Sequence, residues 1–180
     1  MEGDFATEHL PFPMPSRKHT LSQEWRNLTF MHWEVDLEKL RPHVPEDLEI
    51  DTFEGKAYIG VVPFMMKNVR PTWFVSTPFV STFPEFNIRT YVKKDGIAGV
   101  FFLTLEAKSF ITCNFAPKAY GLPYRYAKGS LKKHNSIVTW KSSRQNGKYN
   151  IQGVTRINGV SQQAKKGSLE EFLFERYSLY

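Results

Sequence analysis

Cysteine is almost absent from this sequence, since Cys113 is the only one among 180 residues. A single thiol cannot form an intramolecular disulfide, and the acidic N-terminus lacks the charged-then-apolar pattern of a signal peptide. We therefore expect a cytoplasmic protein. One cysteine also cannot build a thiolate zinc site, and the five histidines are not spaced as metal ligands. The sequence predicts no metal site.

Long apolar runs are also missing. The longest, residues 97–105, is interrupted by Gly99 and Thr104 and is too short to span a bilayer, so we expect no membrane helix. Glycine-rich phosphate-binding loops, the Gly-x-Ser-x-Gly element of serine hydrolases and the His-Glu-x-x-His element of zinc proteases are absent too. We therefore predict no bound cofactor.

Acidic residues are missing from residues 107–169, which contain twelve Lys or Arg residues. Residues 1–60, in contrast, contain twelve acids and six bases. A basic region of this length can bind nucleic acid, an anionic ligand or an acidic partner, and it can equally be a solvated surface. Charge alone does not decide between these alternatives.

The residues that are present favour one ordered domain. Hydrophobic residues make up 41% and aromatic residues 15% of the chain, enough for a substantial core. Residues 1–20 contain three prolines and are expected to form an irregular arm before a domain at 21–180. Segments rich in β-type residues predict strands at 25–35, 48–53, 57–66, 86–92, 99–107, 136–140, 149–154 and 155–160. Helices are expected at 37–41, at 110–120 and after Ser168, which gives an α+β fold with antiparallel strands in a curved or closed sheet.

Turn and cap residues support this division. Asp36 and Ser168 are good N-caps for the first and last helices. Lys94-Asp95-Gly96 and Asn146-Gly147 are hairpin signals, and a further turn is expected at 158–159. Residues 68–84 contain three prolines and are expected to form a long loop, which would be either a binding loop or a surface excursion.

The strand at 86–92 alternates strictly, so its two faces can be assigned. One face carries Phe86, Ile88, Thr90 and Val92, and the other carries Asn87, Arg89 and Tyr91. On the returning strand, Phe101, Leu103 and Leu105 are expected to share a face. The polar face either meets solvent or lines a barrel. Inside a barrel, Arg89 would need Glu85, Glu106 or a bound anion as its partner, because an unpaired buried charge is costly.

A second candidate site lies in residues 120–128. Gly121 and Pro123 fix a rigid corner, after which Tyr124, Arg125 and Tyr126 follow in sequence. Rigidly held loop residues of this kind can form a ligand site, and a packed connection is the alternative. Cys113 with a distant histidine is a formal nucleophile pair, but a lone cysteine is usually a small core residue.

Six segments of the chain, in sequence order, carry a family resemblance: residues 25–33, 51–55, 83–92, 99–102, 122–124 and 168–180. Together they resemble the uncharacterised YqjF-like family of the acetoacetate decarboxylase-like superfamily. The resemblance implies an antiparallel β-barrel or cone around a small-molecule cavity, with a few helices packed outside, and it implies a homo-oligomer. Members usually continue beyond the last segment, so it also implies a domain that is short at its C-terminal end.

Residues 26–51 also resemble the N-terminal region of acetoacetate decarboxylases. Those enzymes use two adjacent lysines in a Pro-Lys-Lys element, one forming a Schiff base and the other lowering its pKa. The matching element here is Pro123-Tyr124-Arg125. A phenol cannot form an imine and a guanidinium stays protonated, so Schiff-base decarboxylation is not expected there. Lys118 or Lys128 reaching in as a substitute is the alternative.

The resemblance also suggests site residues. Arg26 matches the decarboxylases' carboxylate-binding arginine. Ile88 stands where their active-site glutamate would be, which leaves Glu85, Asn87 and Arg89 as candidates for that role.

We predict a pocket for an organic acid or carbonyl compound, with Tyr124 donating a hydrogen bond or proton and with Arg125 and Arg89 adding positive potential. Tyr126 is a further predicted binding residue. Any reaction would be of the lyase or isomerase type. The alternatives are a non-catalytic ligand sensor, a nucleic-acid or partner-binding module that uses residues 107–169, and a structural protein that has lost the site. Nucleic acid is the less favoured partner.

Overall fold

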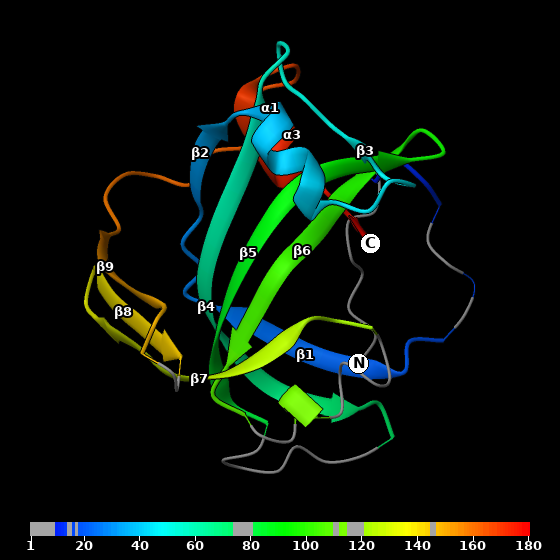
Figure 1. Ribbon diagram of the computed structural model, residues 1–180. Coiled ribbons are helices and arrows are strands. Elements are labelled where there is room, and N and C mark those ends of the chain that lie inside the picture. The colour runs from blue at the N-terminus through cyan, green and yellow to red at the C-terminus, as the bar shows by residue number, and fades with distance from the viewer. Residues whose placement is uncertain are drawn as a thin grey trace.

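The structure, a computed structural model, describes residues 10–13, 16, 18–73, 81–109, 112–114, 121–144 and 147–180. Figure 1 shows a curled sheet with short helices packed at one end. The strands are β1 (Leu21–Arg26), β2 (Met31–Val35), β3 (Glu49–Ile50), β4 (Ala57–Pro71), β5 (Phe83–Lys94), β6 (Ile97–Ala107), β7 (Tyr124–His134), β8 (Ile137–Arg144), β9 (Asn150–Arg156) and β10 (Ser178–Leu179). The helices are α1 (Leu37–Leu40), the short 3-10 helix η1 (Arg41–His43) and α3 (Leu169–Phe174).

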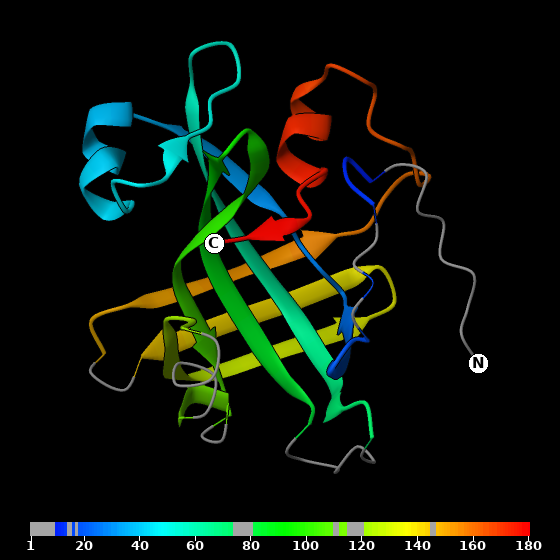
Figure 2. The ribbon, with the colours of Figure 1, turned by 90° about the vertical axis from the view of Figure 1, so that its right-hand side faces the viewer.

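The main path through the sheet runs β1-β4-β5-β6-β7-β8-β9. Strands β2, β3 and β10 add to β4, β5 and β6, respectively. Neighbours are antiparallel except that β7 and β10 each run parallel to β6. Figure 2 shows β7, β8 and β9 crossing the long strands β4 to β6, so the sheet folds over on itself as a half-barrel. The predicted α+β fold with a curled sheet is confirmed.

Strand β5 lies at the centre and is buried on both faces. On one face, Phe86 packs with Leu131, Val138 and Trp140 of β7 and β8. Farther along this face, Val92 packs against the α1 region. The opposite face packs against α3 at one end, and against the side chains of Leu28 and Cys113 at the other. This second face carries the candidate site.

Several local predictions are confirmed. Asp36 caps α1 by accepting the Glu38 N–H at 2.9 Å, and Ser168 caps α3 by accepting the Glu171 N–H at 3.3 Å. At the β5–β6 hairpin, Asp95 and Gly96 have φ values of 52° and 77°, as a two-residue turn of this type requires.

Other boundaries were wrong. The strand expected at 25–35 breaks into β1 and β2, because the chain turns at Asn27, whose φ is 56°. Regular strand structure within 48–53 is confined to β3, and the two strands expected between 149 and 160 are the single strand β9.

The loop expected at 68–84 is shorter, since β4 runs to Pro71 and β5 begins at Phe83, with residues 74–80 outside the described part. Of the helix expected at 110–120, residues 112–114 are helical, and the remaining residues lie outside the described part of the chain.

A β-bulge explains one error in face assignment. The register between β5 and β6 shifts between Ile88 and Arg89, so Leu103 has no partner on β5. Beyond the bulge the side chains of β6 change faces. Phe101 and Leu103 therefore pack with the α1 cluster, whereas Leu105 packs with Tyr91 on the opposite face.

Candidate functional site

Five polar side chains lie in a row on one face of β5: Glu85, Asn87, Arg89, Tyr91 and Lys93, called the β5 row below. Alternation along the strand puts them together, because every second side chain points to the same face. The first four are buried, with exposed fractions of 3%, 3%, 8% and 0%. Their neighbours on β4 are small or apolar: Phe64, Val62 and Gly60 lie beside Glu85, Asn87 and Arg89. The row is therefore a polar stripe inside an apolar core.

The first end of the row contacts Tyr124. Strand β7 starts parallel to β6 with Tyr124 aligned to Leu105, and the Tyr124 hydroxyl donates to Glu85 Oε2 at 2.8 Å. Burial raises the pKa of Glu85 to about 7, and the Tyr124 hydrogen bond opposes this. Burial and the adjacent Glu85 raise the pKa of Tyr124 far above its ordinary value of 10. Near neutral pH, Glu85 can therefore gain or lose a proton while Tyr124 keeps its own.

The other end of the row joins His32 of β2. The Tyr91 hydroxyl and His32 Nε2 are 2.7 Å apart. Gly60 makes this approach feasible, since a Cβ there would lie 3.1 Å from His32 Cδ2 and 3.3 Å from the Tyr91 hydroxyl. Burial and the nearby Arg89 charge lower the pKa of His32 to about 4, so its imidazole is neutral at pH 7.

Past Tyr91, the row ends in a satisfied ionic cluster. Lys93 and Arg176 each lie 2.6 Å from Asp51, one on each carboxylate oxygen. These ion pairs tie the segment after α3 to the sheet.

The middle of the row is incompletely satisfied. Arg89 donates from Nη2 to Leu173 O at 3.3 Å and, at 3.5 Å, to the Tyr91 hydroxyl, and its guanidinium lies 5.1 Å from the Phe30 ring centroid. Arg89 Nε and Asn87 Oδ1 are buried and have no hydrogen-bond partner in the described part of the chain. Since buried polar atoms are usually paired, both call for an explanation.

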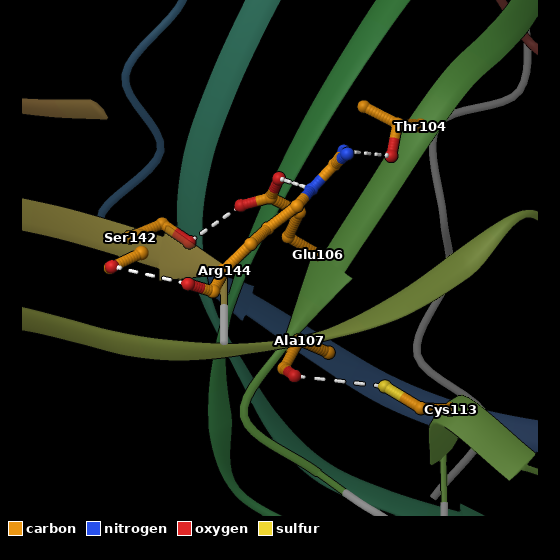
Figure 3. A network of polar contacts seen from close by, with 7 residues as sticks. Thr104, Glu106, Ala107, Cys113, Ser142 and Arg144 are labelled. Carbon is orange, nitrogen blue, oxygen red and sulfur yellow. Dashed lines mark hydrogen bonds and ion pairs between the residues drawn. The ribbon is translucent and has the colours of Figure 1, made fainter. Parts of the chain in front are cut away.

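Neither carboxylate expected for Arg89 is its partner. Glu85 accepts from Tyr124 instead. Glu106 lies on the opposite face of the sheet, where Arg144 Nε and Ser142 Oγ each donate to it at 2.6 Å (Figure 3). Of the partners predicted for Arg89, a bound anion is the one still unassigned.

The Glu106 network was not anticipated from the sequence, because Arg144 is 38 residues away and lies on another strand. Arg144 also donates to Thr104 Oγ1 at 2.9 Å (Figure 3). A cavity of about 180 Å³ adjoins the ion pair, lined on its apolar side by Phe86, Ile88 and Ile151. Both oxygens of the Glu106 carboxylate accept hydrogen bonds within this network. The network therefore needs no further ligand, and it ties β6 to β8.

The other predicted residues lie outside the β5 row. Arg26 is exposed and pairs with Glu24 at 2.7 Å. Its neighbour Trp25 packs on Phe64, which belongs to the face of the β5 row, so Arg26 points to the other face. Arg125 is exposed and, next to Tyr124 on β7, points away from it. Tyr126 is half-buried.

Cys113 lies close to the Glu85 end of the row. It packs with the core around Phe64, and its Sγ is 3.6 Å from Ala107 O (Figure 3). Burial raises the pKa of this thiol. It is therefore a protonated core residue rather than a thiolate nucleophile.

The structure thus brings together Glu85, Asn87, Arg89 and Tyr124, and it leaves Arg26 and Arg125 apart from them. It adds Tyr91, whose place on the polar face of 86–92 was visible in the sequence, and His32, for which no sequence signal pointed to this face.

A second hollow lies elsewhere. It is an open groove of about 1070 Å³ beside α3, and Asp51, Lys93 and Arg176 supply its ionic cluster. These charges already pair with one another. The groove therefore gives less reason than the β5 row to expect a charged ligand. No group of three potential metal ligands occurs among the residues that the structure describes. None of the described helices is long and apolar enough to cross a membrane.

Comparison with known proteins gives consistent results. The model of the DUF2071 family, "Uncharacterized conserved protein (COG2071)", matches residues 22–180. "Uncharacterized protein YqjF" of Bacillus subtilis (strain 168) is 37% identical over 161 residues, which cover 89% of this chain and 66% of that protein.

Two solved structures illustrate the fold. Acetoacetate decarboxylase from Legionella pneumophila superposes with a TM-score of 0.57 at 15% identity, and the match covers 80% of this chain and 54% of the decarboxylase chain. The enduracididine biosynthesis enzyme MppR complexed with pyruvate has a TM-score of 0.58 at 14% identity, covering 81% and 59%. The chain thus spans 66% of the YqjF length and a little more than half of these solved chains.

Proposed function

We propose that this chain, which belongs to the DUF2071 family and has an acetoacetate decarboxylase-like fold, binds a small carbonyl compound bearing a carboxylate at the β5 row. The observation that carries the proposal is the buried Arg89 guanidinium: its Nε, like the Oδ1 of Asn87, has no hydrogen-bond partner among the residues that the structure describes. Burying a charge without a partner is costly, and a carboxylate ligand would offset that cost. Its oxygens would accept from Arg89 Nε, and a ligand hydroxyl, enol or bridging water would donate to Asn87.

Support for the ligand class comes from charge and from fold. No carboxylate forms an ion pair with Arg89 within the described ranges, since Glu85 and Glu106 bond elsewhere. MppR, a protein of the same fold, was solved with pyruvate. A 2-oxo acid of that size is therefore the first probe to use here.

The Glu85–Tyr124 pair gives the site a proton donor and acceptor. With its pKa raised to about 7, Glu85 is suited to take a proton from the carbon beside a carbonyl at neutral pH. Once Glu85 has taken that proton, it can donate to the Tyr124 oxygen, which frees the Tyr124 O–H to donate a hydrogen bond to the oxygen of the resulting enolate. The proposed reaction is of the lyase or isomerase type and begins with enolisation.

This proposal involves no Schiff base. By the sequence resemblance, Tyr124 and Arg125 match the two decarboxylase lysines, and neither side chain can form an imine. Lys93, on the row itself, forms an ion pair with Asp51. Lys128 is exposed on β7. The lone, half-buried Cys113 is consistent with the cytoplasmic location that we propose.

Binding and enolisation can be tested separately. Pyruvate binding is measured by calorimetry, and enolisation by loss of the pyruvate methyl signal in D₂O by NMR. We expect Arg89→Met to abolish binding and Arg125→Met, an exposed control, to retain it. Tyr124→Phe should bind pyruvate and slow exchange. If Arg89→Met bound pyruvate as tightly as the wild-type protein does, the ligand would bind elsewhere and the proposal would be contradicted.

Polyanion binding is a second candidate, favoured by one observation. The strand registers put Lys128, Lys132, Lys141 and Arg156 on the outer face of the β7–β8–β9 sheet, within the acid-free segment. Affinity for a single-stranded oligonucleotide should then fall steeply between 50 and 200 mM salt, on the order of tenfold or more. The double variant Lys132→Glu, Lys141→Glu should lose it. Absence of binding at low salt would rule this candidate out.

A further inference from the structure

Three aromatic side chains form a cluster at Arg89, and one of them lies over its guanidinium. Phe30, which follows the turn after β1, has its ring centroid 5.1 Å from the Arg89 guanidinium and 5.1 Å from that of Phe174 at the end of α3. The His32 ring lies 6.3 Å from Phe30, stacked, and 5.7 Å from Phe174, edge-on. The segments that carry these three rings are far apart in the sequence, and they meet in one aromatic cluster at Arg89.

This aromatic cluster is only half covered. Phe30 and Phe174 are 37% and 43% exposed, although the Arg89 beneath them is 8% exposed. His32 is neutral at pH 7, so it adds an aromatic surface without a second charge. The side chains at this end of the row are therefore apolar and aromatic, and the group below them is cationic.

We propose that the ligand of the β5 row is an aryl-substituted 2-oxo acid rather than a short aliphatic one. This inference rests on the proposed function. The ring of the ligand would cover Phe30 and Phe174, and its carboxylate would reach Arg89 Nε. An aliphatic acid of pyruvate's size would satisfy Arg89 but would leave both rings exposed.

The choice of an aryl group follows from the ring geometry. Phe30, His32 and Phe174 already pack in stacked and edge-on arrangements, which a further ring can extend. Aromatic pairs gain affinity beyond the area that they bury, so each added ring contact favours an aryl over a branched aliphatic group.

The test compares three acids by calorimetry: pyruvate, phenylpyruvate and 4-methyl-2-oxopentanoate. We expect phenylpyruvate to bind about tenfold more tightly than pyruvate or more, with the branched aliphatic acid between them. Phe174→Leu keeps an apolar side chain and is half-exposed, so it should fold. It should reduce the phenylpyruvate advantage over pyruvate several-fold. Trp33→Leu, at a 51% exposed aromatic of β2 outside the cluster, is the matched control and should change neither.

Each outcome separates the two proposals. Equal affinity for pyruvate and phenylpyruvate, or a phenylpyruvate advantage that survives in Phe174→Leu, would overturn the aryl inference and leave the carboxylate site standing. No binding of any of the three acids would overturn the proposed function, and the aryl inference with it.

Discussion

Arg89 shows how much a single side chain can reveal about a site. A guanidinium does not lose its proton in proteins, so burial cannot be relieved by neutralisation. Its contacts with Leu173 O, Tyr91 and Phe30 satisfy it only in part. At the residue scale, the row therefore gives up stability at the position where we propose that an anion binds.

This trade can be measured by comparing the buried Arg89 with the partly buried Arg144. Arg89→Met removes a charge that has no carboxylate partner in the described part of the chain, so the free energy of unfolding should stay unchanged or rise by about 1–2 kcal/mol. Arg144→Met leaves Glu106 buried and without its ion pair, so it should lose about 3 kcal/mol. Urea denaturation at pH 7 measures both. A large loss in Arg89→Met would mean that the fold depends on Arg89.

Glu85 predicts a pH dependence of stability. The pKa is about 7 in the folded chain and 4.5 when exposed, so between these values the folded chain holds a proton that the unfolded chain has lost. The free energy of unfolding should therefore fall as the pH rises from about 4.5 to about 7 and level off above it. A shift of this size corresponds to about 3 kcal/mol. Glu85→Gln cannot ionise and should remove this slope.

His32 contributes to the pH dependence of the unfolding free energy with the opposite sign over the same pH range. Its pKa is about 4 when folded and 6.5 when exposed, so the unfolded chain takes up the proton first as the pH falls. It adds stability that is complete above pH 6.5 and is lost towards pH 4. The difference in unfolding free energy between wild type and Glu85→Gln cancels this term, because both proteins retain His32. A difference that stays constant from pH 5 to pH 8 would show that Glu85 is not a buried, protonated acid.

At the element scale, local signals predicted local structure. The caps at Asp36 and Ser168, the Asp95-Gly96 turn and the alternation of 86–92 all depend on residues within one or two turns of each other, and all are confirmed. The bulge on β6 was not predictable, since it depends on how β6 pairs with β5, and it reversed the expected face of Leu105.

The α3 cap offers a test at this scale. Ser168→Ala removes the side-chain acceptor for the Glu171 N–H and should lower the free energy of unfolding by about 1 kcal/mol. Ser136→Ala, in an exposed turn, is the control and should have almost no effect. Urea denaturation measures both. Equal stabilities of the two variants would contradict the capping role.

The whole molecule depends on pairings between distant segments, and these limited what the sequence could predict. Glu85 and Tyr124 were both candidates, but their contact requires β7 to run parallel beside β6. The Glu106–Arg144 pair and the approach of His32 to Tyr91 likewise depend on how the sheet folds over. Composition and local pattern therefore predicted most of the strands and the site candidates Glu85, Asn87, Arg89 and Tyr124, whereas tertiary pairing decided which side chains meet.

Gly153 tests the packing of the folded-over sheet. A Cβ at this position would lie 2.2 Å from Trp140 Cζ2, and Trp140 belongs to the core between β5 and the β7–β9 sheet. Gly153→Ala should therefore cost about 2 kcal/mol of unfolding free energy. Tryptophan fluorescence in urea follows the transition, with Gln152→Ala on the exposed face of β9 as the control. An unchanged midpoint would contradict this packing.

The central claim is that Arg89 Nε binds a carboxylate, and its N–H group can be observed directly. The measurement is a ¹H–¹⁵N NMR titration of the arginine Nε–H signals with pyruvate and phenylpyruvate, with the Arg89 signal assigned by its loss in Arg89→Lys. We predict that this signal shifts to saturation while those of the exposed Arg26 and Arg125 stay in place. An Arg89 signal that does not move when ligand binding is saturated would contradict the account.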